Sequence, residues 1–130
     1  MYTAIRRYTV APGRLSRIAS EAEESFLPVV RTLPGFVAYF LVDGGQENGR
    51  DVLTTVSIFE TRETANESVR RSALWVREHL QPGDDARGPE VTAGPTRIAS
   101  IRSGMAEGGG GAGYRVAGDA RDLVETPRGP

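Results

Sequence analysis

The side chains in this chain that are best suited to chemistry lie along one flank of a predicted helix. Ser68, Ser72, Trp75 and His79 recur at the spacing i, i+4, i+7 and i+11, which places them on one side of that helix. An indole stacks on aromatic rings, a serine hydroxyl forms hydrogen bonds, and a histidine changes its charge near neutral pH. These four residues could therefore form one wall of a pocket for an aromatic ligand.

Two predicted strands supply further candidates. Arg6 and Arg7 stand in the middle of a strand predicted over residues 2–10, and because side chains alternate along a strand, the two arginines point to opposite faces of the sheet. If both faces are covered, at least one arginine is drawn towards the interior. The alternative is that the strand lies at an edge, or that its guanidinium groups reach water. Tyr39, on a strand predicted over 36–42, could approach the pocket from the sheet.

Structural roles compete with these functional ones. Trp75 could simply fill the junction between helix and sheet, because aromatic side chains often do so without any ligand. His79 stands near the end of its helix, where the helix dipole favours a positive charge. A capping or surface role for His79 is therefore the competing interpretation.

Composition excludes several classes of function. The chain has 130 residues, a net charge of −1 and 38% hydrophobic residues, which is typical of a single soluble globular domain. The absence of cysteine excludes disulfides, thiolate catalysis and cysteine-ligated metal centres, and the absence of lysine excludes a Schiff base on the protein. A single histidine excludes a multi-histidine metal site within one subunit.

Charge and hydropathy also limit the partners and the location. A near-neutral balance gives no broad basic surface for nucleic acid. No apolar run approaches the ~20 residues that span a bilayer. The N-terminus enters a strand-like pattern instead of a signal segment, so we expect a cytoplasmic protein.

Hydrophobic periodicity predicts four strands and two helical segments. The strands are expected over 2–10, 36–42, 52–59 and 90–101, with Asn48-Gly49 turning a hairpin between the second and third. The first helical segment has an apolar stripe at spacings of three and four, formed by Leu15, Ile18, Ala19, Ala22, Phe26, Val29 and Leu33. Pro28 falls inside it and predicts a kink or a break near 25–28.

The second helix is expected from an N-cap at Thr61 to about Leu80. Its expected core face comprises Ala65, Val69, Ala73, Val76 and Leu80. Gly94-Pro95 interrupts the last strand, which argues for an edge position or a bulge. Residues 1–102 form one predicted domain, and the Gly- and Pro-rich tail over 103–130 is expected to be disordered.

The order β-α-β-β-α-β is that of the α+β ferredoxin-like fold, a four-stranded antiparallel sheet with both helices on one face. The strand over 36–42 has no charged residue. Phe36, Ala38, Phe40 and Val42 are expected on one face, and Val37, Tyr39 and Leu41 on the other. A second copy of the sheet is the economical cover for the face without helices, so the sequence predicts a homodimer.

Four short motifs carry a resemblance to a known family. They run from Val10 to Gly13, from Leu33 to Phe36, from Ser57 to Glu63 and from Trp75 to His79. In order and spacing they resemble the antibiotic biosynthesis monooxygenase family of dimeric α+β barrels, over about residues 1–102. The resemblance implies a homodimer with one pocket per subunit between sheet and helices. Some members oxidise polycyclic phenols to quinones with molecular oxygen and no cofactor, others degrade haem, and many have no known activity.

In cofactor-free oxygenation the deprotonated substrate itself gives an electron to oxygen. The protein then supplies an apolar pocket, a base or hydrogen-bonding group, and positive charge for the anion. On this resemblance the expected catalytic residues are Trp75, His79 and Arg6, and the expected substrate contacts are Tyr39, Ser68, Ser72 and Phe40, with no metal or cofactor. Arg71 stands where an Asn one turn before the tryptophan would strengthen the match.

Several functions remain open at this point. The first is a cofactor-independent monooxygenase acting on a small aromatic or polycyclic phenol. The second is a non-catalytic homodimer that binds a hydrophobic ligand, and the third is a structural dimer whose pocket is filled by its own side chains. Haem degradation would use His79 as the iron ligand, but those enzymes carry an Asn on the first strand, and residues 2–10 contain none.

Overall fold

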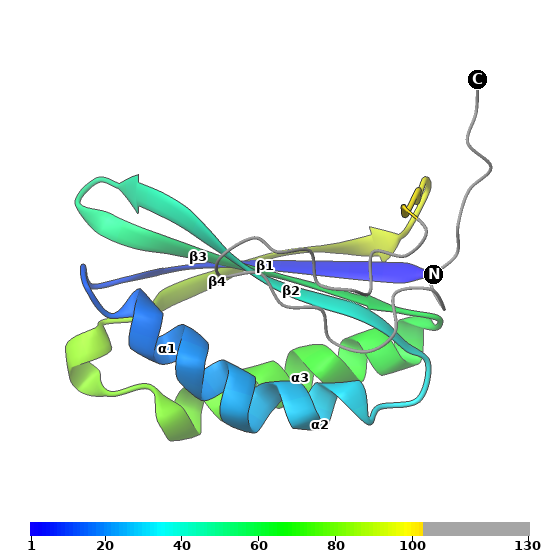
Figure 1. The fold of residues 1–130 in the computed structure, drawn as a ribbon, viewed down its shortest axis with the longest axis horizontal. Helices are drawn as coiled ribbons and strands as arrows, with labels where there is room; N and C mark the ends of the chain where they lie inside the picture. The colour runs from blue at the N-terminus through cyan, green and yellow to red at the C-terminus, as the bar shows by residue number, and fades with distance from the viewer. Residues whose placement is uncertain (103–130) are drawn as a thin grey trace.

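The computed structural model describes residues 1–102, which form one antiparallel sheet with all helices on one of its faces (Figure 1). The elements are β1 (Tyr2–Val10), α1 (Leu15–Glu21), a π-helical turn η1 (Ala22–Phe26), α2 (Leu27–Arg31), β2 (Phe36–Glu47), β3 (Arg50–Phe59), α3 (Arg62–His79), a 3₁₀ turn η2 (Pro82–Asp84) and β4 (Arg87–Pro95). The strand order is β2-β3-β1-β4. The predicted ferredoxin-like fold is confirmed. The tail predicted over 103–130 lies outside the described residues.

Strand β1 lies inside the sheet, between β3 and β4. Side chains alternate as expected along it: Arg6 and Tyr8 are buried beneath the helices, whereas Ile5 and Arg7 face the other side. The alternative that this strand lies at an edge is therefore wrong. The edge strands are β2 and β4, and β4 ends at Pro95 instead of continuing to residue 101.

The central hairpin is longer than predicted. Strand β2 continues to Glu47, and the reversal at Asn48-Gly49 uses positive φ angles of 53° and 76°. Such angles are typical of a type I′ hairpin turn and explain the Asn-Gly pair.

An irregularity in β2 corrects the expected position of Phe36. The register with β3 shifts between Phe36 and Ala38, so that Phe36 pairs with Phe59, which is buried beneath the helices. The two rings contact each other edge to face, with centroids 5.8 Å apart. Phe36 therefore does not share a face with Ala38 and Phe40, because the extra residue reverses the alternation.

The break predicted near Pro28 is a turn of π-helix over Ala22–Phe26. Proline has no N–H group to donate to the preceding turn, so the regular α-helical pattern cannot continue through Pro28. Within this turn the Ser25 hydroxyl donates to the Glu21 carbonyl oxygen at 2.8 Å. The π-helical turn thus fixes the direction of the Ser25 side chain.

Helix α3 begins as predicted, with Thr61 Oγ1 accepting a hydrogen bond from the Thr64 N–H at 3.3 Å. Its buried face differs from the expected one and comprises Ala65, Ser68, Ser72 and Trp75. Ala73, expected in the core, is exposed. Small serine side chains let this face approach the sheet closely, and the Ser68 hydroxyl is satisfied by the Ala65 carbonyl oxygen at 2.7 Å. The predicted core face is therefore confirmed for Ala65, Val76 and Leu80, which are buried or packed against the core, and wrong for Ala73.

Within residues 1–102, no helix lies on the other face of the sheet (Figure 1). Apolar side chains on it include Ile5, Ala38, Phe40, Val42, Val56 and Ile58. Phe40 retains 47% of its surface exposed, an unusual exposure for a large ring on a sheet. None of the helices within residues 1–102 is long and apolar enough to cross a membrane.

Candidate functional site

A small cavity of about 30 Å³ lies between the sheet and the helices, next to Trp75. Its wall is mostly apolar and aromatic and comprises Tyr8, Val10, Ile18, Ala22, Phe26, Tyr39, Leu41, Leu53, Thr55, Ser72, Trp75, Val76 and Leu80. The predicted site residues Tyr39, Ser72 and Trp75 therefore come together around one space. This volume holds only one or two water molecules.

Arg6 is buried beside this cavity with 1% of its surface exposed. The β1–β3 register places it opposite Thr55, one of the cavity's lining residues. Its Nε donates to Thr55 Oγ1 at 3.0 Å and its Nη2 to Ser57 Oγ at 3.1 Å. Its Nη1 has no hydrogen-bond partner, and within residues 1–102 Arg6 forms no ion pair with a carboxylate.

An unpaired buried charge is energetically costly. Moving an ion out of water costs several kcal/mol even after the protein relaxes, and hydroxyl acceptors offset only part of that cost. Burial lowers the pKa of Arg6 from its usual value, and the nearby Tyr39 and Tyr8 act in the opposite direction. Because arginine keeps its proton in proteins, the site holds a positive charge that an anion would compensate.

Arg6 is not part of the cavity wall, but Tyr8 and Tyr39, which lie near enough to influence its charge, are. Burial raises the pKa of Tyr39 to about 12, although the positive charge of Arg6 favours its ionised form. Tyr39 is therefore a neutral phenol at physiological pH and can donate a hydrogen bond. The Tyr8 hydroxyl lies 3.3 Å from Ser72 Oγ, which connects the sheet to α3 beside the cavity.

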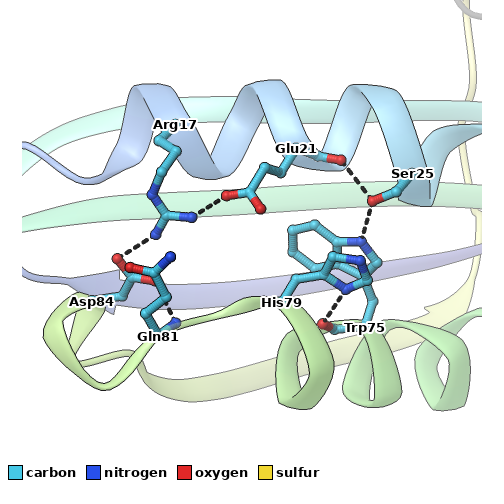
Figure 2. A network of polar contacts seen from close by, with 7 residues as sticks. All are labelled: Arg17, Glu21, Ser25, Trp75, His79, Gln81 and Asp84. Atoms are coloured by element: carbon cyan, nitrogen blue, oxygen red, sulfur yellow. Dashed lines mark hydrogen bonds and ion pairs between the residues drawn. The ribbon is translucent and has the colours of Figure 1, made fainter.

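Trp75 contributes an aromatic wall whose polar atom is already engaged. Its Nε1 donates to Ser25 Oγ at 2.7 Å (Figure 2). Its ring packs near Phe26, with centroids 6.1 Å apart. The His79 ring stacks on it at 4.7 Å and 13°. One face of the indole is thus covered by His79, so a ligand would meet Trp75 as an apolar surface.

His79 lies behind Trp75, and the cavity wall does not include it. Its Nδ1 donates to the Trp75 carbonyl oxygen at 3.0 Å, one of the last carbonyl groups of α3 (Figure 2). This is the capping interaction that the sequence left open as an alternative. The placement does not support His79 as a base acting inside the cavity.

Two other predicted contacts also lie away from the cavity. Ser68 is buried, but its hydroxyl is bound within α3 and it is not part of the cavity wall. Phe40 faces the side of the sheet opposite the cavity, because residues one apart on a strand alternate faces and Tyr39 faces the helices. The prediction that Phe40 contacts a ligand in this cavity is therefore wrong.

Sequence reasoning missed three residues that shape the site. Thr55 and Ser57 hold the Arg6 guanidinium, and Ser25 holds Trp75. A signal for the first two was present, because they are polar residues two apart on the strand predicted over 52–59 and therefore share a face. Nothing in the spacing of Ser25 indicated its partner, which lies 50 residues away.

Haem does not fit the residues present. An iron ligand at His79 would have to leave a ring that is stacked on Trp75 and bound to its carbonyl oxygen. The uncompensated charge beside the cavity belongs to an arginine, which cannot ligate iron. The residues around the cavity therefore do not form a haem site.

Replacing Arg6 by methionine should raise the free energy of unfolding by about 1 kcal/mol or more, because an apolar chain of similar length removes an uncompensated buried charge. Arg50 is the matched control, since it is also largely buried but bonds Thr9 and Asp85. Arg50→Met should lower stability by about 1–3 kcal/mol. Chemical denaturation of the three proteins measures both effects. If Arg6→Met lowers the free energy of unfolding as much as Arg50→Met does, Arg6 is a structural residue.

No protein-family model and no curated protein matches the sequence. Solved structures do match its fold. A monooxygenase from the gene ActVA-Orf6 of Streptomyces coelicolor, in complex with Nanaomycin D, aligns with a TM-score of 0.59 and 18% identity over 78% of this chain and 92% of that one. SnoaB, a cofactor-independent oxygenase from Streptomyces nogalater, aligns with a TM-score of 0.52 and 15% identity over 75% and 94%.

The haem-degrader MhuD from Mycobacterium tuberculosis, with two haems in its active site, has the same fold. It aligns with a TM-score of 0.56 and 15% identity over 78% of this chain and all of that one. Identities this low establish architecture and leave activity open. The chain therefore has the ferredoxin-like fold of antibiotic biosynthesis monooxygenases, as the sequence motifs indicated.

Proposed function

We propose that the chain binds a small aromatic or polycyclic phenol as an anion beside Trp75 and oxidises it with molecular oxygen, without a cofactor. The observation that carries this proposal is the uncompensated charge of Arg6 next to an aromatic-lined cavity. Cofactor-free oxygenation needs a substrate anion, and a buried positive charge stabilises one. The fold shared with SnoaB, a cofactor-independent oxygenase, supports the same chemistry.

The reaction balances without any group outside substrate and oxygen. The substrate anion gives one electron to O₂, the resulting radical pair combines into a hydroperoxide, and loss of water leaves a carbonyl. For an anthrone, the ring CH₂ becomes C=O, one oxygen atom enters the product and the other leaves as water. The four electrons lost by carbon are the four that reduce O₂.

In this proposal each site residue has a distinct role. Arg6 supplies the charge that favours the anion, and the neutral hydroxyl of Tyr39 donates a hydrogen bond to its oxygen. Trp75 and Phe26 form the wall against which the rings pack. Ser72 orients Tyr8 at the cavity's edge.

The residues of the cavity wall also limit which substrates the site could oxidise. Among the described residues that line it there is no carboxylate and no imidazole. The substrate must therefore be acidic enough to release its proton to water with only Arg6 to help it. Hydroxyanthrones, whose anion is delocalised over fused rings and a carbonyl group, meet this requirement better than simple phenols. The lack of a carboxylate or imidazole among these lining residues also favours a second candidate function, in which the protein binds such an anion but does not convert it.

We also propose that two copies pair through the uncovered face of the sheet. Its apolar side chains lie in the middle, and Arg7 is neutralised there by Glu47 and Glu90. Covering such a surface stabilises each subunit by roughly 25 cal/mol per Å² of apolar area. Exposed apolar patches of this kind mark interaction sites.

Oxygen uptake with 1,8-dihydroxyanthrone tests the proposed reaction. Metal-free protein should consume oxygen above the uncatalysed rate. Arg6→Met should lower this rate about 10²-fold, because the anion loses its counter-charge, and Trp75→Phe should lower it less. Arg70→Met, at an exposed position on α3, is the matched control and should leave the rate unchanged.

Equal rates for Arg6→Met and the unmodified protein would contradict the role of Arg6. Saturable binding without oxygen uptake would favour the second candidate.

Sedimentation analysis of Phe40→Asp tests the pairing. The unmodified chain should sediment as a dimer, and a carboxylate placed in the middle of the apolar face should make it monomeric. Leu74→Asp is the matched control, because Leu74 is equally exposed, at 48%, but lies on α3. A dimer that persists in Phe40→Asp and dissociates in Leu74→Asp would place the interface on the helices instead.

A further inference from the structure

The cavity beside Trp75 is too small for any ring-sized ligand. Ligand pockets enclose roughly 300–1,000 Å³, whereas this space measures about 30 Å³. Strands β1, β2 and β3 form one side of the cavity. They are joined by backbone hydrogen bonds, so moving them apart would cost much free energy. Any added space must therefore come from the roof, where the helical segment over 15–31 meets α3.

Two side-chain bridges join the two sides of that roof, and Figure 2 shows both. One links Arg17 of α1 to Asp84, which follows α3. The other is the hydrogen bond from Trp75 to Ser25. Glu21 connects them, since its carboxylate contacts Arg17 and its carbonyl oxygen accepts from Ser25.

The bridge between Arg17 and Asp84 is the stronger of the two. Its carboxylate is buried and accepts hydrogen bonds from Arg17 and from the Gln81 N–H, the latter at 2.7 Å. Its carbonyl oxygen accepts from the Ala11 N–H at 2.8 Å. The end of α3 is thus tied both to α1 and to the chain that leaves β1. Charge-assisted bonds of this kind are about twice as strong as neutral ones.

The bridge at Ser25 is weaker. It is one hydrogen bond between neutral groups, with a net worth of about 1 kcal/mol. Ser25 also lies in the π-helical turn before Pro28, where the regular helical bonding is interrupted. Because its hydroxyl proton is donated to Glu21, an oxygen lone pair is free to accept from the Trp75 Nε1–H.

We propose that Ser25 is the positioning residue of Trp75 and the latch of this cavity. The Ser25–Trp75 bond holds the indole against the roof, and it opens when a ring-sized ligand enters, while the Arg17–Asp84 bridge stays closed as the fixed end. The proposal rests on the proposed function only in assuming that an aromatic ligand binds here.

The latch can be tested without any ligand. Trp75 is the single tryptophan of the chain, so its fluorescence reports this position alone. Ser25→Ala should raise the rate constant for quenching by acrylamide about fivefold, as expected from the loss of about 1 kcal/mol. Ser25→Thr, which keeps the hydroxyl, should restore protection. Ser20→Ala, the same change at an exposed position of α1, should have no effect.

Ser25→Cys provides the same test if the alanine variant does not fold, because a thiol of similar size is a weak acceptor. It should be quenched faster than the threonine variant. Equal protection of Trp75 in every folded variant would overturn the proposal.

A second measurement separates this proposal from the proposed function. The probe 1,8-dihydroxyanthraquinone should quench Trp75 as it binds, and its association rate constant should be about fivefold higher in Ser25→Ala. Binding at equal rates in both proteins would overturn the latch. Absence of probe binding in both would count against the proposed function, and the acrylamide result would still decide the latch.

Discussion

Within residues 1–102, a buried positive charge without a carboxylate partner is the constraint on which the proposed function of this fold depends. Arg6 stands in the middle of an interior strand. Side chains alternate along a strand, so Arg7 faces the side without helices and Arg6 is buried beneath the helices, away from water. The fold accommodates the guanidinium with the hydroxyls of Thr55 and Ser57 and leaves one nitrogen unbound. A sequence selected for stability alone would place an apolar residue there. We propose that this charge is half of an ion pair whose other half is the ligand.

The surrounding elements cover this charge and leave a small cavity next to it. A face of alanine and serines lets α3 lie close to the sheet, and its one large buried side chain, Trp75, closes the space where the serines end. On the other side, Pro28 interrupts the regular helix and the π-helical turn directs Ser25 at the indole. The same interruption that weakens the helix makes this side of the roof the one that can open.

Most of the fold could be predicted from the sequence, because it depends on local signals. The Asn48-Gly49 turn, the Thr61 cap and Pro28 each act on their own neighbours, and their order identifies the topology. The errors have equally local causes. One extra residue in β2 turned Phe36 to the other face, and Ser68, whose hydroxyl is bound within its own helix, was taken for a ligand contact on one flank of α3. The candidate site was harder, because the partners of Arg6 and Trp75 lie about 50 residues away.

The central claim is that Arg6 recognises the deprotonated form of an aromatic ligand. The most direct test is the absorption spectrum of a hydroxyanthraquinone, whose neutral and ionised forms differ in colour, titrated free and bound to the protein. Bound to the unmodified protein, its phenol should ionise at least about one pH unit lower than in water, equivalent to about 1.4 kcal/mol, and Arg6→Met should abolish this shift. A bound ligand that ionises at the same pH in both proteins would contradict the account.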